Sequence, residues 1–411
     1  MSRLAALLSL GLILGGWGCD NSARSDAGGA QWYHAHLATV GGDRFPFFLQ
    51  VPDDCESGAA TIVNGEEQLR ADCRRSPVGF VVDFPVYGTQ IEAWFKPDGS
   101  LTGHWCRERP HGRDPILSFK ARPIDEPDPG DRFPVDWARA EANPPRANVA
   151  GTWRMEFDDH GVARGVLVQD ASGVVTGTVE VPQQYGDLRF LAGNVRGTRM
   201  QLSTFDGQHA GLLQGEVRPD GVLDGEWVGE DSRDLFVAER AEDFDIPDPL
   251  DRVRLKPEAS RLELAPLRDP KYAGKAVIVE LFGTWCPNCN DHAPLLVDLY
   301  REYGPQGLEI LGLAYEYADS RDYAERRVRE FKEKHGVEWD VVIADSTLEE
   351  LADEGLAGLS SIEGVPVTIF VNPDRTVHAV YTGFSGPATG AAHRKAKAQF
   401  RKLTAELLDG I

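Results

Sequence analysis

The stretch from Lys275 to Pro294, KAVIVELFGTWCPNCNDHAP, constrains the fold more than any other part of the chain. It opens with the apolar, largely β-branched run Ala276–Leu281, which is typical of a buried strand. Cys286 and Cys289 then form a Cys-x-x-Cys sequence, and the residues that follow can form a helix. The order predicts two thiols between the end of a strand and the first turn of a helix. Backbone N–H groups and the helix dipole stabilise a thiolate there, so the first thiol is expected to be nucleophilic near neutral pH.

The length and charge of the chain limit what surrounds this stretch. With 411 residues the chain is expected to form two or three domains. Its formal net charge of −22 argues against nucleic acid as a partner and against electrostatic docking on anionic lipid. After residue 19 no stretch reaches the apolar length of a membrane span.

The N-terminus has the layout of a bacterial export signal. Arg3 precedes the apolar run Leu4–Leu14, and small residues lead to Cys19. Residues 1–18 are therefore predicted to be an export signal and residues 19–30 a flexible tether. Cys19 resembles a lipidation site that anchors the chain to a membrane, and a plain cleaved signal is the alternative. Both place the mature chain outside the cytoplasm, at the periplasmic or cell-surface face of a bacterial membrane.

Three further cysteines lie in the first part of the chain, at Cys55, Cys73 and Cys106. Outside the cytoplasm a structural disulfide persists, so one bridge among the three is expected, although the sequence does not select the pair. The Cys-x-x-Cys has no second cysteine pair and no histidine at ligand spacing, which makes it a poor zinc site. We expect neither a metal nor a cofactor.

Two all-β modules are predicted at residues 31–121 and 151–242, because short alternating segments are punctuated there by Gly, Pro, Asn and Asp. Each has the size of a small sandwich or barrel. The Pro-rich, acidic segments 122–150 and 243–269 are predicted linkers. Pro97–Trp105 recurs as Pro219–Trp227 with six of nine positions identical, which suggests an internal duplication.

From residue 270 to residue 411 the pattern changes to alternating strands and helices, which predicts an α/β domain with a mixed sheet. Within it, Gly364-Val365-Pro366-Val367-Thr368 follows the cysteine pair by about eighty residues. These two motifs, with the closing hairpin and helix, make this domain resemble the thioredoxin superfamily, and within it the exported TlpA-like thiol–disulfide reductases. In that family the proline at the position of Pro366 is cis and faces the active-site disulfide.

The resemblance implies a role for each residue of the two motifs. Cys286 would attack a substrate disulfide, and Cys289 would resolve the mixed disulfide from one helical turn further in. Pro366 would present the carbonyl group of Val365 to an extended substrate segment. The remaining residues expected at the substrate site are Trp285, Pro287 and Asn288.

Two ionisable residues flank the cysteine pair. Glu280 lies in the middle of the apolar strand, where the family can place a buried acid, and an unpaired carboxylate is costly to bury. We expect it to take the proton of Cys289 during the attack, and a strand-edge glutamate in solvent is the alternative. His292 lies where related reductases often carry a glutamate. Two interpretations carry equal weight: a residue that tunes the thiols, or a surface histidine.

Together these features predict a thiol–disulfide oxidoreductase that acts on protein thiols and disulfides outside the cytoplasm, with the reducing direction favoured. A reductase there needs a membrane electron donor. A thiol peroxidase is one alternative, disfavoured by the close spacing of Cys286 and Cys289. The other is a ligand- or partner-binding lipoprotein whose redox domain is regulatory. The role of the two β-modules stays open.

Overall fold

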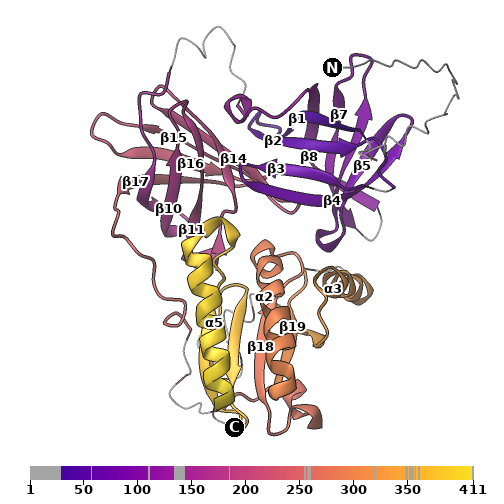
Figure 1. Cartoon of the computed structure of the whole chain (residues 1–411), viewed down its shortest axis with the longest axis vertical. Coiled ribbons are helices and arrows are strands. Elements are labelled where there is room, and N and C mark those ends of the chain that lie inside the picture. The colour runs from indigo at the N-terminus through magenta and orange to yellow at the C-terminus, as the bar shows by residue number, and fades with distance from the viewer. Residues whose placement is uncertain are drawn as a thin grey trace, which may run out of the picture.

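The computed structural model describes residues 29–56, 58–109, 112–133, 144–184, 186–253, 256, 261–317, 320–347, 350, 356, 358–359 and 362–409. Two β-barrels lie side by side, and an α/β domain lies below them (Figure 1). The predicted fold class, two all-β modules followed by an α/β domain with a mixed sheet, is confirmed. The predicted export signal and Cys19 fall outside the described residues. Within the described part, no helix is both long enough and apolar enough to cross a membrane.

The first barrel is a closed antiparallel sheet in which each strand pairs with the next and the last pairs with the first. Alternate residues of each strand face the interior, so the buried positions follow a period of two. Its strands are β1 (Ala30–Ala38), β2 (Arg44–Pro52), β3 (Ala60–Asn64), β4 (Glu67–Ser76), β5 (Gly79–Phe84), β6 (Thr89–Phe95), β7 (Leu101–Arg109) and β8 (Gly112–Ile124).

The second barrel has the same up-and-down order and is closed by pairing of β10 with β11. The two-residue strand β12 pairs with β11 outside the ring. The strands are β9 (Gly151–Phe157), β10 (Gly161–Gln169), β11 (Val174–Val181), β12 (Gly186–Asp187), β13 (Leu191–Arg196), β14 (Arg199–Phe205), β15 (Ala210–Val217), β16 (Leu223–Val228) and β17 (Arg233–Arg240).

The repeated segment occupies equivalent places in the two barrels. It joins β6 to β7 in the first ring and β15 to β16 in the second, the sixth and seventh ring strands in each case. The glycine shared by the repeats lies in both copies where the neighbouring strand comes too close for a side chain. A Cβ atom on Gly103 would lie 1.8 Å from the Glu92 carbonyl oxygen, and one on Gly225 would lie 2.2 Å from that of Gln214. Matching strand order and matching close approaches support duplication of one barrel.

The barrels pack against each other through a phenylalanine of the second barrel. Phe205, at the end of β14, is fully buried and places its ring 5.0 Å from Phe47 and 5.2 Å from Trp105 of the first barrel, centroid to centroid. Its carbonyl oxygen accepts a hydrogen bond of 2.9 Å from the side chain of Asn64. Aromatic burial of this kind holds the two barrels together as a unit.

Part of the segment 122–150, predicted as a linker, is structural. Strand β8 continues to Ile124, and Arg132 is 2% exposed. Its guanidinium group donates to the Asn64 side chain at 2.9 Å and to the Ser203 hydroxyl at 3.1 Å, and so bridges the barrels. The prolines and acids that suggested a linker lie on either side of Arg132. Among these flanking residues, 134–143 lie outside the described part.

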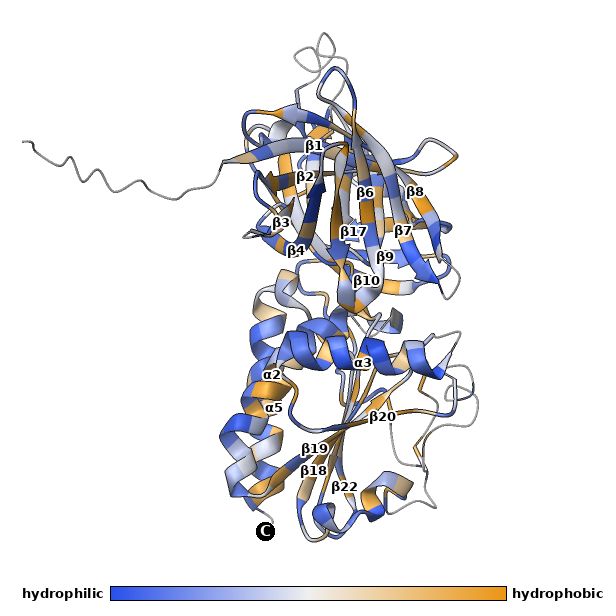
Figure 2. Cartoon of the chain, turned by 90° about the vertical axis from the view of Figure 1, so that its right-hand side faces the viewer, coloured by the Kyte–Doolittle hydropathy of each residue, from blue (hydrophilic) through white to orange (hydrophobic). Residues whose placement is uncertain are grey.

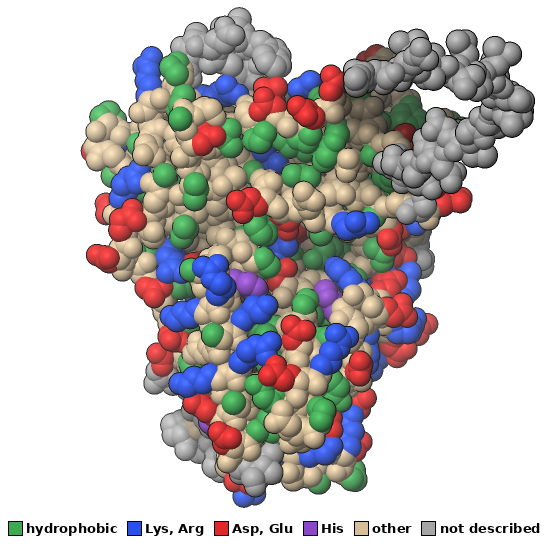
Figure 3. All heavy atoms as spheres, viewed as in Figure 1, with side chains coloured by type: hydrophobic (Ala, Val, Ile, Leu, Met, Phe, Trp, Pro, Cys, Tyr) green, Lys and Arg blue, Asp and Glu red, His purple; other side chains and the backbone are tan. Residues whose placement is uncertain are grey.

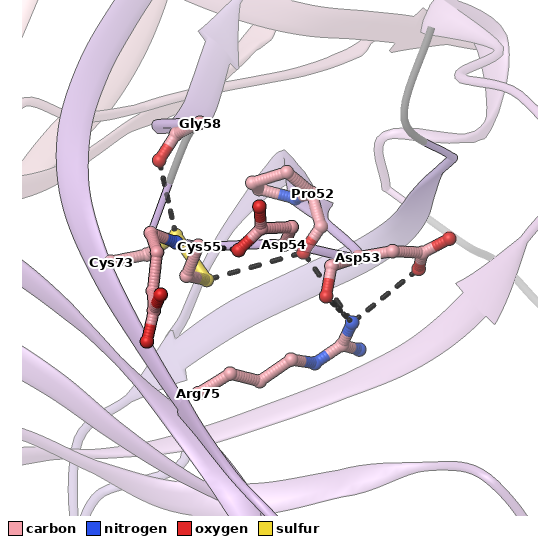
Figure 4. The surroundings of a disulfide bond; sticks show 8 residues. Pro52, Asp53, Asp54, Cys55, Gly58, Cys73 and Arg75 are labelled. Atoms are coloured by element: carbon pink, nitrogen blue, oxygen red, sulfur yellow. Dashed lines mark hydrogen bonds and ion pairs between the residues drawn. A yellow bond between two sulfur atoms is a disulfide. The ribbon is translucent and has the colours of Figure 1, made fainter. Parts of the chain in front are cut away.

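A disulfide joins Cys55 to Cys73 in the first barrel (Figure 4). It fastens the loop after β2 to β4, and Arg75 beside it donates to the carbonyl oxygen of Asp53 at 3.1 Å. Cys106, the third candidate, is a free and buried thiol. The expected single bridge is thus present, and the structure selects the pair.

The α/β domain is built on the mixed sheet β20-β19-β18-β21-β22, in which β18 is central. Helices α2 and α5 lie side by side along it (Figure 2). Buried hydrophobic residues of the sheet and of these helices form the core. Its elements are β18 (Ala276–Phe282), α2 (Pro287–Tyr303), β19 (Leu308–Ala314), α3 (Arg321–His335), β20 (Asp340–Ile343), β21 (Val367–Val371), β22 (Val377–Thr382) and α5 (Ala391–Asp409).

Short 3₁₀ helices occupy several of the connections. They are η1 (Pro85–Tyr87), η2 (Pro129–Asp131), η3 (Pro182–Gln184), η4 (Ala265–Arg268), η5 (Pro270–Tyr272), η6 (Gly304–Gln306) and η7 (Pro387–Thr389). Acidic and basic side chains alternate over the face of the molecule drawn in Figure 3, as expected for a solvated surface.

Candidate active site at the dithiol

The two cysteines lie where the central strand gives way to a helix. Strand β18 is buried along its whole length, and α2 begins with Pro287, whose fixed φ suits the first helical position. Cys286 is the N-cap of α2, and its Sγ accepts a hydrogen bond of 3.2 Å from the backbone N–H of Cys289. This donor and the positive end of the helix dipole stabilise negative charge on the Cys286 sulfur.

The two thiols differ in environment. Cys286 is 5% exposed, whereas Cys289 is fully buried. Burial raises the pKa of the Cys289 thiol well above its ordinary value, and the neighbouring Cys286 and Glu280 raise it further. Cys289 is therefore held as a thiol, and it needs a base nearby before it can attack.

The Val365-Pro366 loop faces the first thiol. The Cys286 Sγ lies 3.7 Å from the carbonyl oxygen of Val365, and the Val365–Pro366 peptide bond is cis, as the resemblance implies. The indole Nε1 of Trp285 donates to the Tyr315 carbonyl oxygen at 2.8 Å, which fixes the ring beside the dithiol. The residues predicted at the substrate site are thus brought together around the Cys286 sulfur.

Glu280 and His292 form a buried pair behind the dithiol. Both side chains are fully buried, with Glu280 on the central strand, so the solvent-exposed alternatives for these two residues are wrong. The Glu280 Oε1 lies 3.4 Å from the His292 Nδ1, and neither side chain makes a hydrogen bond of good geometry within the described residues. The imidazole ring also packs on Phe384 and Phe400, with centroids 4.7 and 4.8 Å away.

Glu316 is a residue that the sequence reasoning missed. It follows β19 and accepts hydrogen bonds from the backbone N–H of Thr284 at 2.8 Å and from its hydroxyl at 2.7 Å. Burial raises the pKa of Glu316 to about 7. The sequence signal that could have identified Glu316 is its position directly after a parallel strand, at the sheet edge that carries the cysteines.

A buried ion cluster, also missed, joins all three domains next to α2. Arg189 of the second barrel donates to the carboxylate of Glu67 in the first barrel at 2.9 Å and to that of Asp291 in α2. Its Nε lies 3.7 Å from the Asp206 Oδ2. Burial raises the pKa of Asp291 to about 7 even though Arg189 opposes the shift. The cluster, defined as these four residues with Asp187, fixes the barrels to the helix that carries the dithiol.

The second barrel covers the active site. A Cβ atom on Gly186 of β12 would lie 1.1 Å from the Asn288 side-chain nitrogen, so the barrel backbone rests directly on the Cys-Pro-Asn-Cys turn. The backbone N–H of Gly386 donates to Asp187 at 2.7 Å nearby. Between these contacts a cavity of about 490 Å³ remains, lined by Cys286, Val365 and residues of the second barrel.

The sequence of the C-terminal region matches those of known proteins. The sequence profile of the AhpC/TSA family matches residues 237–381. The thiol–disulfide oxidoreductase ResA of Halalkalibacterium halodurans is 30% identical over 112 residues, which cover 27% of this chain and 55% of that protein. ResA of Bacillus subtilis is 28% identical over 123 residues, which cover 30% of this chain and 59% of that protein. The chain thus spans little more than half the length of these relatives.

Two solved structures align with 33% and 40% of the chain. A thiol:disulfide interchange protein of the thioredoxin family from Chlorobium tepidum has a TM-score of 0.25 at 24% identity, covering 33% of this chain and 82% of that one. A DsbF homologue from Corynebacterium diphtheriae has a TM-score of 0.28 at 19% identity, covering 40% of this chain and 98% of that one. On the sequence matches, the C-terminal region is an AhpC/TSA thioredoxin-like domain with distant ResA-like thiol–disulfide oxidoreductase relatives.

Proposed function

We propose that this protein is a thiol–disulfide oxidoreductase that reduces protein disulfides outside the cytoplasm, with Cys286 as nucleophile and Cys289 as resolving thiol. The observation that carries the proposal is the asymmetric dithiol: the Cys286 Sγ accepts a hydrogen bond from the Cys289 N–H at the start of α2, whereas the Cys289 thiol is fully buried. One sulfur is stabilised as a thiolate, and the other is shielded until a mixed disulfide forms beside it.

The reaction runs in two exchanges. The Cys286 thiolate attacks one sulfur of the substrate disulfide, a bond forms between these sulfurs, and the other substrate sulfur leaves as a thiolate. Cys289 then loses its proton and attacks the Cys286 sulfur, so the intramolecular disulfide forms and the second substrate sulfur leaves. Both leaving thiolates take up a proton. The substrate is reduced by two electrons, and the protein dithiol is oxidised.

Glu280 is the base in this proposal. It is fully buried on β18 and lies near enough to contribute to the raised pKa of the Cys289 thiol, so its carboxyl group is placed to accept the Cys289 proton. His292, whose Nδ1 lies 3.4 Å from the Glu280 Oε1, is the polar side chain placed beside this carboxyl group in the buried pair. A base in this position receives the proton without admitting water to the core.

The substrate side of the site is formed by the residues around the Cys286 sulfur. The carbonyl oxygen of Val365 lies 3.7 Å from the Cys286 sulfur, so it is placed to accept a hydrogen bond from an extended substrate segment bound there. Trp285, Pro287 and Asn288 supply the remaining surface, and each lines the cavity beneath the second barrel.

Location and direction form part of the proposal. The N-terminal sequence supports export and lipid anchoring at Cys19, and the Cys55–Cys73 disulfide suits an oxidising compartment. A reductase there is recharged by a membrane electron donor that supplies a dithiol. A thiol peroxidase is the second candidate, because the AhpC/TSA profile matches this region. The close placement of Cys289 against Cys286 favours disulfide exchange instead.

A redox titration tests the direction. The full chain is equilibrated in thiol buffers of graded potential, quenched with an alkylating reagent, and the Cys286 and Cys289 peptides are quantified by mass spectrometry. A potential near −270 mV, about that of thioredoxin, supports a reductase, and one near about −120 mV makes the protein an oxidase. Peroxide consumption that survives in the Cys289→Ser variant would establish the peroxidase instead.

A further inference from the structure

The cavity over the dithiol is a chamber between two domains. Its floor is the active-site surface with Trp285, Cys286 and Val365, and its walls come from turns at one end of the second barrel. The barrel residues in these walls include Thr204, Asp206, His209–Gly211, Trp227, Gly229, Glu230, Ser232 and Asp187–Arg189. We call this cavity, of about 490 Å³, the barrel chamber.

The size of the barrel chamber restricts what reaches the Cys286 sulfur. Cavities of this volume enclose ligands the size of a drug molecule. The contact between Gly186 and Asn288 leaves no space for a protein surface to pack on that side of the dithiol. Tyr317 is 60% exposed and the His209 side chain 50% exposed, so solvent reaches the chamber along its rim. A short extended segment or a small disulfide can enter there, whereas the face of a folded protein cannot.

The walls of the barrel chamber are acidic. The carboxylates that line it are those of Asp187, Asp206, Glu230 and Glu363, against the single guanidinium of Arg189. Arg189 pairs with Asp206 of the wall and also with Glu67 and Asp291, which do not line the chamber, so its single positive charge is shared among three carboxylates.

The two histidines of the wall are each beside an acid. His209 Nδ1 lies 3.6 Å from Glu230, and the imidazole of His160 contacts Asp234. Protonation of either ring therefore cancels at most the charge of its own partner. The electrostatic potential in the chamber therefore stays negative when the His209–Glu230 and His160–Asp234 pairs are counted.

Two residues of the chamber lining also carry buried polar atoms without a hydrogen bond in the described part of the chain. The Thr204 hydroxyl is in a side chain 4% exposed, lines the chamber, and has no hydrogen-bond partner among the described residues. The Asp206 Oδ2 likewise lacks a hydrogen bond, although the other oxygen of that carboxylate accepts from the backbone N–H groups of Gln208 and His209. The Asp206 Oδ2 is paired instead with Arg189, whose Nε lies 3.7 Å away.

We infer that the barrel chamber selects disulfides flanked by positively charged ammonium groups, carried on a small molecule or on a short extended peptide. The inference rests on the proposed disulfide-exchange function and adds its substrate class. The exchange itself is unchanged: the Cys286–Cys289 dithiol is oxidised and the cationic disulfide is reduced to two thiols. The second barrel then acts as the specificity element of the enzyme.

A charge series of small disulfides tests the inference. The reduced full-length protein is mixed in single turnover with three disulfides: cystamine (dication), 2-hydroxyethyl disulfide (neutral) and 3,3′-dithiodipropionate (dianion). Each rate is divided by the rate at which dithiothreitol reduces the same compound, which corrects for differences in intrinsic reactivity. Cystamine should react about tenfold or more faster than the dianion at low salt, and the ratio should fall as salt screens the charges. A Lys-flanked peptide disulfide should follow cystamine, and a folded protein with a surface disulfide should react slowest.

Two variants locate the effect. Glu230→Gln should lower the ratio of the cystamine rate to the dianion rate at least threefold. Glu216→Gln should leave this ratio unchanged, because Glu216 lies at the end of strand β15 that is away from the chamber. Equal corrected rates across the charge series, or a preference for the dianion, would overturn the inference while leaving the proposed function intact. Failure of all three compounds to oxidise the dithiol would instead count against the proposed function.

Discussion

Replacing Arg189 with methionine should loosen the junction of the three domains in a pH-dependent way. The Arg189 side chain is 12% exposed and pairs with the carboxylates of Glu67, Asp206 and Asp291. Removing one partner of a buried ion pair leaves an uncompensated charge and costs about 3–5 kcal/mol. We expect a loss of that size in the free energy of unfolding of Arg189→Met at pH 8.

The sign of the pH dependence follows from Asp291. Its pKa is raised from 3.8 to about 7, a change that corresponds to roughly 4 kcal/mol. The folded state therefore binds this proton more tightly than the unfolded state, and the stability it contributes is fully present below about pH 4 and lost as the pH rises through 7. At pH 5 Asp291 is protonated and needs the guanidinium group less, so the loss in Arg189→Met should shrink by about 2 kcal/mol or more.

Urea unfolding of wild type and Arg189→Met at pH 5 and pH 8 measures this difference. The matched control is Arg218→Met, because Arg218 pairs with Asp220 and Asp224 at the surface and is 46% exposed. That variant should lose no more than about 1 kcal/mol at either pH. Equal losses at both pH values in Arg189→Met, or a loss no larger than in the control, would refute the account of the ion cluster.

Three other changes have distinct outcomes. Glu280→Gln should slow oxidation of the dithiol by about 10²-fold near neutral pH, measured by stopped-flow tryptophan fluorescence, and an unchanged rate would remove Glu280 as the base. Replacing Cys55 and Cys73 together with alanine should lower the unfolding free energy by about 3 kcal/mol, since the bridge spans 18 residues, without altering the rate of exchange. Burial raises the pKa of Cys106 to about 11, so iodoacetamide at pH 8 should label Cys286 well before Cys106; equal labelling in a peptide map would contradict this.

Local sequence patterns were enough to predict the dithiol and its strand. A β-branched run, the Cys-x-x-Cys spacing and the Val365-Pro366 pair are all short-range signals. Glu280 could be recognised as buried because its sequence neighbours are apolar. The alternation of buried and exposed residues likewise predicted two β-modules, and the recurring Pro-Asp-Gly turn indicated their duplication.

The remaining features depend on contacts between distant parts of the chain. His292 is buried by Phe384 and Phe400, about a hundred residues away, so its own helix could not show whether it faced the core. Closure of the barrels depends on pairing between first and last strands. The junction at Arg189 joins carboxylates from three domains, and no sequence spacing predicts that a surface-type residue is buried there.

Trapping of the mixed disulfide tests the central claim, that Cys286 attacks and Cys289 resolves. The reduced Cys289→Ser and Cys286→Ser proteins are each mixed with 2-hydroxyethyl disulfide, quenched with acid and analysed by intact mass and peptide mapping. The account predicts a stable adduct on Cys286 in the first variant and almost none on Cys289 in the second, because that thiol is fully buried with a raised pKa. Adduct formation on Cys289 at a comparable rate, or no adduct on Cys286, would contradict it.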